Sequence, residues 1–245
     1  MEYLYQIGKY MLMLKSIFVR PERKAMYWTE TLRQMHQIGV DSMIIVFIIS
    51  FFIGAVSAVQ FAYNLSSTIT PMYFVGYIVK ESMIMEFAPT VSALILAGKV
   101  GSNIASELGT MRLTEQIDAL EIMGVNTTSY LIGPKLVAAL TMIPLLVVFA
   151  ACIGIWGGML AGMSSGYVSS TEYIQGVLSW FVPRNAYIMM IKAVVFSFLI
   201  VSISSYKGYY SKGGALEIGK ASTSAVVISC ISVLVADYLI AWLVL

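Results

Sequence analysis

The sequence predicts an all-α integral membrane protein, and three observations support this class. Apolar residues make up 59% of the 245 residues and charged residues 11%, whereas soluble domains carry about 25% charged residues. Several apolar stretches reach about 20 residues, the length that crosses a hydrocarbon core. Lys and Arg gather in some connections between these stretches and avoid others. We expect one domain over 1–245, with an interfacial segment at 1–38 and a transmembrane part at 39–245.

The first expected element is an amphipathic helix at the membrane interface. Apolar residues recur there at helical spacing, with Lys9, Lys15 and Arg20 between them, which is typical of a helix lying in the plane of the interface. A soluble helix packed on a partner is the alternative. We expect no cleavable signal peptide, because no compact basic, apolar and small-residue pattern is present. The apolar positions are Tyr3, Leu4, Ile7, Met11, Leu14, Ile17 and Phe18.

Five membrane-spanning helices are expected next. The fourth apolar run is interrupted only by Lys192, and the third is longer than one span requires. A run of that length tilts or projects beyond the bilayer. The predicted spans cover 42–63, 83–106, 131–163, 186–206 and 221–244.

The distribution of Lys and Arg predicts the orientation of these spans. Basic residues precede the first span, and they recur at Arg112 and within 207–220, whereas 64–79 has none and 164–185 has only Arg184. The positive-inside rule then places the N-terminus and the second and fourth connections in the cytoplasm, and the C-terminus outside. On the outer side, residues 169–181 are expected to form a short helix that Ser170 or Thr171 caps and that stops before Pro183.

A charged segment at 107–124 separates two long apolar runs and must leave the membrane. We expect a short helix over 114–123, with Thr114 as its N-cap and Gly124 as its stop. One face is apolar and suits the ends of the spans, and the other is acidic and suits a second protein. A plain solvated turn is the alternative. The apolar face comprises Leu113, Ile117, Leu120 and Met123, and the acidic face Glu115, Asp118 and Glu121.

Small residues and buried charges mark the interior of the bundle. Gly154, Gly158, Gly162 and Gly166 form a smooth stripe on span three, which favours close helix packing within the chain or between subunits. Ala93, Ala97, Gly101, Ala105 and Gly109 form a similar stripe on span two. Charges at membrane depth are costly and tend to pair. We therefore expect an ion pair between Lys192 and Asp237, and pairing or a polar cavity for Lys80, Glu81, Glu86 and Lys99.

The chain offers no catalytic constellation. His36 is the single histidine, and Cys152 and Cys230 both fall in apolar runs, where small core residues are more typical than a disulfide or a metal pair. Gly214–Ala221 resembles a phosphate-binding loop, but Ala221 replaces the required Ser or Thr and no strand precedes it. We expect that this chain is not an enzyme and that it binds no metal, cofactor or nucleic acid. Any ATP-driven step would use a nucleotide site on another chain.

The central segment resembles the signature of the MlaE (YrbE-type) permease family, the membrane subunits of ABC transporters that work with MCE-domain proteins. The matching residues are Glu107-Leu-Gly-Thr-Met-Arg-Leu-Thr-Glu-Gln-Ile-Asp-Ala-Leu-Glu-Ile-Met-Gly124. Glu86-Phe-Ala-Pro89, Ala97-Gly-Lys-Val-Gly-Ser102 and Pro134-Lys135 also fit the family, so the resemblance covers essentially the whole chain.

The resemblance implies a homodimeric permease in the inner membrane of a Gram-negative bacterium that moves phospholipid between this membrane and the periplasm. Two cytoplasmic ATPase subunits would dock on the helix 114–123, and an MCE-domain ring would sit on the periplasmic face. A self-sufficient secondary transporter or channel for a small amphiphile is the alternative. The implied docking residues are Glu107, Arg112, Glu115, Gln116, Asp118 and Glu121. The implied residues of the lipid cavity are Val59, Gln60, Tyr63, Tyr77, Lys80, Glu81 and Met83.

Overall fold

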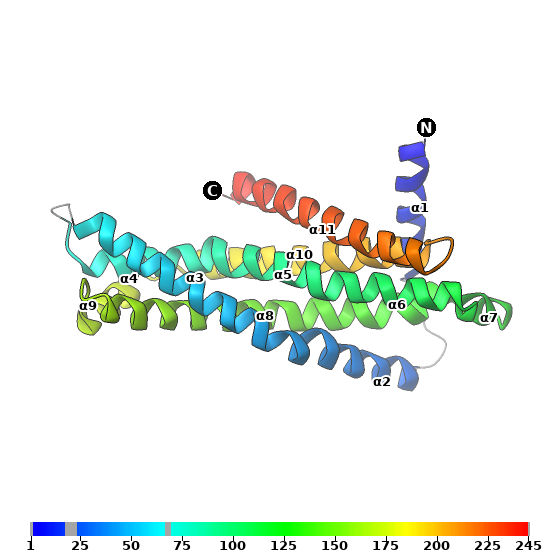
Figure 1. Cartoon of the computed structure of the whole chain (residues 1–245), viewed down its shortest axis with the longest axis horizontal. Helices are drawn as coiled ribbons and strands as arrows, with labels where there is room; N and C mark the ends of the chain where they lie inside the picture. The colour runs from blue at the N-terminus through cyan, green and yellow to red at the C-terminus, as the bar shows by residue number, and fades with distance from the viewer. Residues whose placement is uncertain (1, 18–23, 67–69, 245) are drawn as a thin grey trace.

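The computed structural model describes residues 2–17, 24–66 and 70–244, and these residues form a bundle of helices (Figure 1). Five helical stretches are long and apolar enough to cross a membrane, as the sequence predicts. They are Tyr27–Ser66, Tyr73–Leu113, Thr127–Ser164, Pro183–Tyr209 and Ala215–Val244. The described residues contain no strand, so the all-α class with five candidate spans is confirmed.

The first span begins earlier than its apolar run. Helix α2 (Lys24–Met35) continues through a π-helical turn, η1 (His36–Val40), into α3 (Asp41–Ser66). The predicted border at residue 38 therefore lies inside one continuous helical stretch. Helix α2 packs on α8 (Thr127–Ser164), so packing against the bundle extends the helix beyond what hydropathy alone indicates.

The second span also begins earlier, at Tyr73 rather than at 83. It comprises α4 (Tyr73–Ser82), η2 (Met83–Val91), α5 (Ser92–Leu96), η3 (Ala97–Gly101) and α6 (Ser102–Leu113). The segments η2 and η3 are π-helical. Pro89 lies inside η2, and because proline has no backbone N–H it removes one bond of the regular helical ladder. A wider turn at this position follows from that loss.

Helices α3 and α8 pack backbone against backbone. A Cβ atom at Gly54 would lie 1.8 Å from the carbonyl oxygen of Gly154, and one at Gly158 would lie 3.1 Å from that of Gly54. Gly162 has only ordinary contact, at 3.9 Å. Gly166 is different, because it follows the end of α8 with φ of 73° and has nothing within 4 Å of its Cβ position. It serves a turn rather than the predicted packing stripe.

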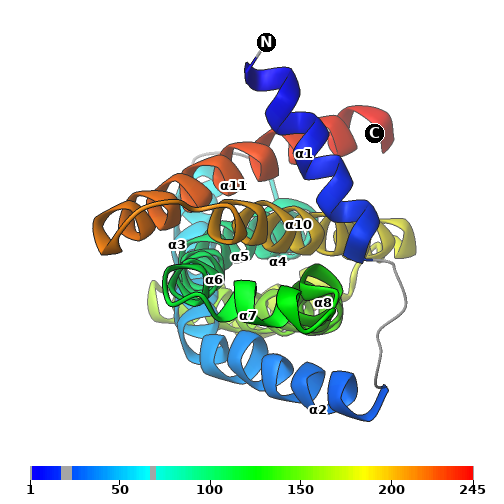
Figure 2. The same ribbon diagram turned by 90° about the vertical axis from the view of Figure 1, so that its right-hand side faces the viewer.

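Span two packs its small residues on the later helices. A Cβ at Gly101 would lie 2.8 Å from the Ser204 hydroxyl of α10 (Pro183–Tyr209), and one at Gly109 would lie 3.0 Å from Ile218 of α11 (Ala215–Val244). Helix α11 lies on the outside of the bundle and crosses α10 obliquely (Figures 1 and 2). Many of its apolar side chains are therefore uncovered, among them Val227, Ile231, Leu234, Val235, Tyr238 and Trp242.

Helix α8 has 38 residues, or about 57 Å at 1.5 Å per residue. A hydrocarbon core of about 30 Å cannot contain it, so α8 extends beyond the core. Two short helices mark the ends of the bundle: α7 (Gln116–Ile122) lies at one and α9 (Ser170–Leu178) at the other (Figure 1). We call these the α7 end and the α9 end.

Helix α9 is capped one residue before the predicted positions. The Ser169 side chain accepts from the Glu172 backbone N–H, and Glu172 accepts from the Ser169 N–H in a capping box. Neither Ser170 nor Thr171 is the N-cap, because the Glu172 carboxylate completes the box with Ser169. Hydrogen bonds that the Ser169 backbone N–H and the Ser169 hydroxyl donate to the Glu172 carboxylate lower the pKa of this carboxyl. Pro183 is the first residue of α10, where its missing N–H costs nothing.

Helix α1 (Glu2–Ile17) lies across the bundle near its α7 end (Figures 1 and 2). It buries Met13 and Ile17 and leaves Ile7 and Met11 exposed, together with Tyr5 and Leu12. The Tyr10 hydroxyl donates to Ser202 of α10 at 2.8 Å. An exposed apolar side on a crosswise helix is what an interfacial helix presents to lipid. The side chains of Tyr3 and Leu4, and residues Phe18 and Arg20, lie outside the described part.

Candidate functional sites

The α7 helix begins later than predicted and without the predicted cap. Thr114 ends α6, and its hydroxyl donates to the Thr110 carbonyl at 2.9 Å. Glu115 then reverses the chain in the left-handed conformation, with φ of 58°. Because the Thr114 hydroxyl is used by the preceding helix, it does not cap α7. The predicted stop holds: Gly124 has φ of 80°, and the Val125 N–H donates to the Leu120 carbonyl at 3.1 Å, as in a Schellman motif.

An internal network ties α7 to the bundle. The Arg112 guanidinium lies 2.7 Å from Asp118 and 3.5 Å from Glu121. The Tyr209 hydroxyl of α10 donates to Glu121 at 2.9 Å and is hydrogen-bonded to Thr127 of α8 at 2.6 Å. Two carboxylates predicted to face a partner are thus paired within the chain. The sequence does not predict this pairing, because Arg112 reaches Asp118 and Glu121 only after the chain reverses at Glu115.

The exposed surface of α7 is more apolar than the sequence predicts. Of the predicted apolar face, Ile117 is buried, whereas Leu113 and Met123 are exposed. Ile122, which belongs to neither predicted face, is 88% exposed. Glu115 and Gln116 are exposed as well. Because Glu115 is in the left-handed conformation and α7 begins only at Gln116, the faces expected for a helix over 114–123 are not kept.

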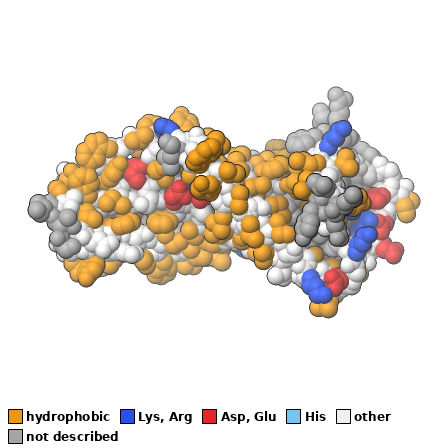
Figure 3. All heavy atoms as spheres, turned by 90° about the horizontal axis from the view of Figure 1, so that it is seen from above, with side chains coloured by type: hydrophobic (Ala, Val, Ile, Leu, Met, Phe, Trp, Pro, Cys, Tyr) orange, Lys and Arg blue, Asp and Glu red, His pale blue; other side chains and the backbone are white. Residues whose placement is uncertain are grey.

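Glu107 lies away from this exposed surface, on α6. Its carboxylate accepts from the ammonium of Lys135 at 2.6 Å, and Lys135 on α8 is buried. Because an unpaired buried ammonium is costly, Glu107 has a structural task inside the bundle. On the face shown in Figure 3, charged side chains gather at the α7 end, and hydrophobic side chains are spread over the rest of the bundle, where a few charged ones also appear.

Three of the predicted cavity residues share a groove toward the α9 end. Val59, Gln60 and Tyr63 line a groove of about 560 Å³ between α3 and the end of α8. The other lining residues are Ala55, Val56, Ala161 and Tyr167. The walls are apolar, and the Gln60 amide and two tyrosine hydroxyls supply the polar groups.

The other four predicted cavity residues lie elsewhere. Tyr77 stacks edge-on against Trp180 with ring centroids 5.7 Å apart. Lys80 is buried, donates to the Ser179 carbonyl at 2.8 Å and pairs with Glu81 at 3.4 Å. Met83 is buried against Gly154. Tyr77 and Lys80 contact the α9 region because α4 and α9 cross closely: a Cβ at Gly176 would lie 1.9 Å from the Tyr73 carbonyl oxygen. The sequence does not reveal this crossing.

An ion cluster centred on a buried lysine joins three spans. The Lys192 ammonium of α10 lies 2.7 Å from Asp237 of α11 and 2.8 Å from Glu86 of η2. The expected pair of Lys192 and Asp237 is therefore present, with Glu86 as a third member. Lys192 also donates to the carbonyl of Met85 at 2.9 Å. The ammonium therefore contacts the backbone of η2 as well as two carboxylates.

The ion cluster does not have the form of a metal site. Within residues 2–17, 24–66 and 70–244, no group of three or more His, Cys, Asp or Glu side chains could hold a metal ion. A lysine at the centre of two carboxylates instead balances charge inside the bundle.

The five long apolar helices define a protein of the multi-pass membrane class. Residues 31–243 match the family described as Permease MlaE. A probable ABC transporter permease protein of Rickettsia bellii is 37% identical over 96% of this chain and 90% of its own length. The intermembrane phospholipid transport system permease protein MlaE of Haemophilus influenzae is 30% identical over 98% of this chain and 92% of its own. The chain belongs to the MlaE permease family.

Proposed function

We propose that this chain is the permease subunit of an ABC transporter that moves phospholipid between the inner membrane and the periplasm. The match to the Permease MlaE family over residues 31–243 carries this proposal. The Haemophilus influenzae relative is named as a permease of an intermembrane phospholipid transport system, which supports phospholipid as the substrate. Two copies of the chain, two ATPase subunits and a periplasmic MCE-domain protein make up the proposed assembly. ATP is hydrolysed on the separate ATPase subunit, and this chain needs no cofactor.

The exposed surface of α7 is the proposed docking site for the ATPase. A helix that projects at the end of a membrane bundle with an 88% exposed isoleucine offers an apolar anchor for a partner's pocket. Glu115 and Gln116 flank it with polar groups. On the face shown in Figure 3, Lys and Arg side chains gather at the α7 end, so this is the cytoplasmic end in this proposal, in accord with the positive-inside rule.

The network around Arg112 gives the proposed docking helix a connection to the spans. Arg112 pairs with Asp118 and Glu121, and Glu121 accepts from Tyr209 at the end of α10. Movement of α7 by an ATPase would therefore displace α10 as well as α6 and α8. Since α10 holds Lys192, which contacts η2 and α11, the displacement would reach the later spans as a rigid-body shift.

The groove at Val59, Gln60 and Tyr63 is the proposed lipid-binding surface on the periplasmic side. Its apolar walls suit acyl chains, and its polar groups suit a headgroup at the membrane boundary. The uncovered apolar face of α11 is the proposed contact with the second copy. A second copy would bury side chains such as Ile231 and Trp242, which the monomer leaves exposed.

Replacing Ile122 with aspartate tests the docking assignment. A charge at the centre of an apolar contact is expected to weaken ATPase association by a factor on the order of 100, or about 3 kcal/mol. Because the side chain makes little contact within the chain, insertion and thermal stability are expected to stay unchanged. Co-purification of the ATPase with tagged protein in mild detergent measures the effect.

The matched control is Leu178→Asp, which places the same charge at a 76% exposed residue of α9, at the opposite end of the bundle. It is expected to leave ATPase association intact. If Ile122→Asp retains the ATPase as well as Leu178→Asp does, α7 is not the docking helix.

A further inference from the structure

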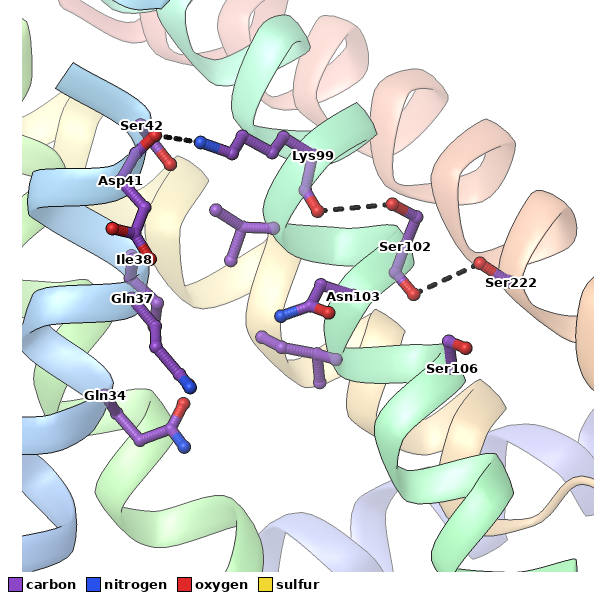
Figure 4. Close-up of a pocket in the computed structure, with 12 residues that line it drawn as sticks. Gln34, Gln37, Ile38, Asp41, Ser42, Lys99, Ser102, Asn103, Ser106 and Ser222 are labelled. Atoms are coloured by element: carbon purple, nitrogen blue, oxygen red, sulfur yellow. Dashed lines mark hydrogen bonds between the residues drawn. The ribbon is translucent and has the colours of Figure 1, made fainter. Parts of the chain in front are cut away.

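A polar pocket opens between the first two spans on the α7 side of the bundle (Figure 4). Its volume is about 590 Å³, and it lies between the α2–η1–α3 stretch and the η3–α6 stretch. Gln34 and Gln37 point across the open space toward Asn103 in Figure 4. The pocket shares no lining residue with the groove at Tyr63, so it is a separate feature.

Several polar groups in this pocket have no partner among the described residues. The Ser42 hydroxyl is fully buried and makes no hydrogen bond. The side chains of Gln37, Asn103 and Ser106 also make none among these residues. Gln34 uses one amide N–H on Glu30 and keeps its carbonyl oxygen. The Ser42 hydroxyl is buried, so leaving it unpaired costs free energy, and the exposed side chains of Asn103 and Ser106 offer further donors and acceptors to a ligand in the pocket.

The pocket carries one charge of each sign. The ammonium of Lys99 is hydrogen-bonded to the backbone carbonyl of Asp41, and an ammonium has two further donors. The Asp41 carboxylate lies 3.6 Å from the His36 ring and is half exposed. A ligand phosphate would be attracted by Lys99 and by the Asn103 amide, and a ligand ammonium by Asp41. A zwitterion is therefore the complementary charge pattern.

The position of the pocket along the bundle matches the level at which lipid headgroups lie. Asp41 and Gln60 are separated along α3 by about 28 Å, close to the thickness of a hydrocarbon core, which is about 30 Å. In a bilayer parallel to this separation, the pocket and the groove would lie near the two boundaries of the hydrocarbon core. Between them α3 exposes an apolar stripe at four-residue spacing, which acyl chains would cover. The stripe comprises Ile44, Ile48, Phe52 and Val56.

We propose that this pocket binds the headgroup of a phospholipid bearing both a phosphate and an ammonium, drawn from the leaflet at the α7 end. It is then a second lipid site, and the stripe on α3 leads from it to the groove at the α9 end. The choice of lipid as ligand rests on the proposed function, but the binding itself requires neither ATP nor the ATPase.

Photo-crosslinking from inside the pocket tests this inference. The full chain, with benzoyl-phenylalanine at Gln37 or at Ser106, is placed in vesicles of phosphatidylethanolamine and phosphatidylglycerol, of which one is radiolabelled. We expect labelling by phosphatidylethanolamine to exceed labelling by phosphatidylglycerol about fivefold, a difference of about 1 kcal/mol. Lys99→Met is expected to lower the labelling about tenfold, and Lys212→Met, an exposed lysine outside the pocket, is expected to leave it unchanged.

Three outcomes would overturn the inference. One is the absence of lipid adducts at both pocket positions while a probe at Ile48 on the stripe is labelled. Another is an adduct with a second copy of the chain in place of lipid, which would mean that the pocket is filled by protein. The last is complete competition by an equal concentration of glycerophosphoethanolamine, which would make the ligand a free solute. None of these results bears on ATPase association, so Ile122→Asp still tests the proposed function separately.

Discussion

Replacing Lys192 with methionine is expected to destabilise the bundle by about 3–5 kcal/mol, the range for breaking a buried ion pair. The Lys192 side chain is 2% exposed and that of Asp237 is 15% exposed. Without the ammonium, Asp237 and Glu86 repel each other, and the Met85 carbonyl loses its donor. The midpoint of thermal unfolding of the full chain in detergent, followed by tryptophan fluorescence, measures the loss.

The triple variant Lys192→Met, Glu86→Gln, Asp237→Asn separates charge from packing. It removes all three charges, so it is expected to recover most of the stability that Lys192→Met loses. Lys212→Met, which removes an exposed lysine, is the control for net charge and should unfold at the wild-type temperature. A Lys192→Met protein that also unfolds there would show that the cluster does not stabilise the fold.

Gly54→Ala is expected to destabilise the packing of α3 on α8 by on the order of 3 kcal/mol. The added methyl group would lie 1.8 Å from the Gly154 carbonyl oxygen, which is backbone and has no rotamer to escape into. The two helices would have to separate, and the nearby contact between Gly158 and the Gly54 carbonyl would be lost. Thermal unfolding in the same detergent reports the change.

Gly162→Ala on α8 is expected to change the stability in the opposite direction. Its Cβ would meet Tyr173 at 3.9 Å, an ordinary contact, and alanine in a helix is favoured over glycine by about 0.5–1 kcal/mol. A slightly raised unfolding temperature is therefore expected for Gly162→Ala and a lowered one for Gly54→Ala. If Gly162→Ala and Gly54→Ala changed the unfolding temperature equally, the close backbone contact at Gly54 would not be what determines the stability of this packing.

The spans were predictable because hydropathy acts locally along the chain. Each predicted apolar run lies inside a candidate spanning helix, and Gly124 ends α7 because only a residue tolerant of positive φ fits there. The extensions at 27–41 and 73–82 depend on contacts with α8 and α9. Those contacts join residues far apart in sequence, and hydropathy carries no information on them.

The candidate sites were predictable as regions but less so as individual residues. Charge placement indicates α7 as the docking region, yet the orientation of Asp118 and Glu121 depends on the reversal at Glu115 and on Tyr209, 88 residues beyond Glu121. Glu86 lies 106 residues before Lys192, so its part in the ion cluster requires the packing of α10 on η2.

The ion cluster also imposes an order on biosynthesis. A lysine at the centre of a membrane helix costs about 2.5–3.5 kcal/mol on insertion, and Lys192 reaches the membrane when α10 is made. Glu86 has been inserted by then, because η2 precedes α10 in the chain, whereas Asp237 has not yet been translated. Glu86 is therefore the carboxylate of the cluster that is available to pair with Lys192 as α10 inserts, and we expect Asp237 to complete the cluster when α11 follows.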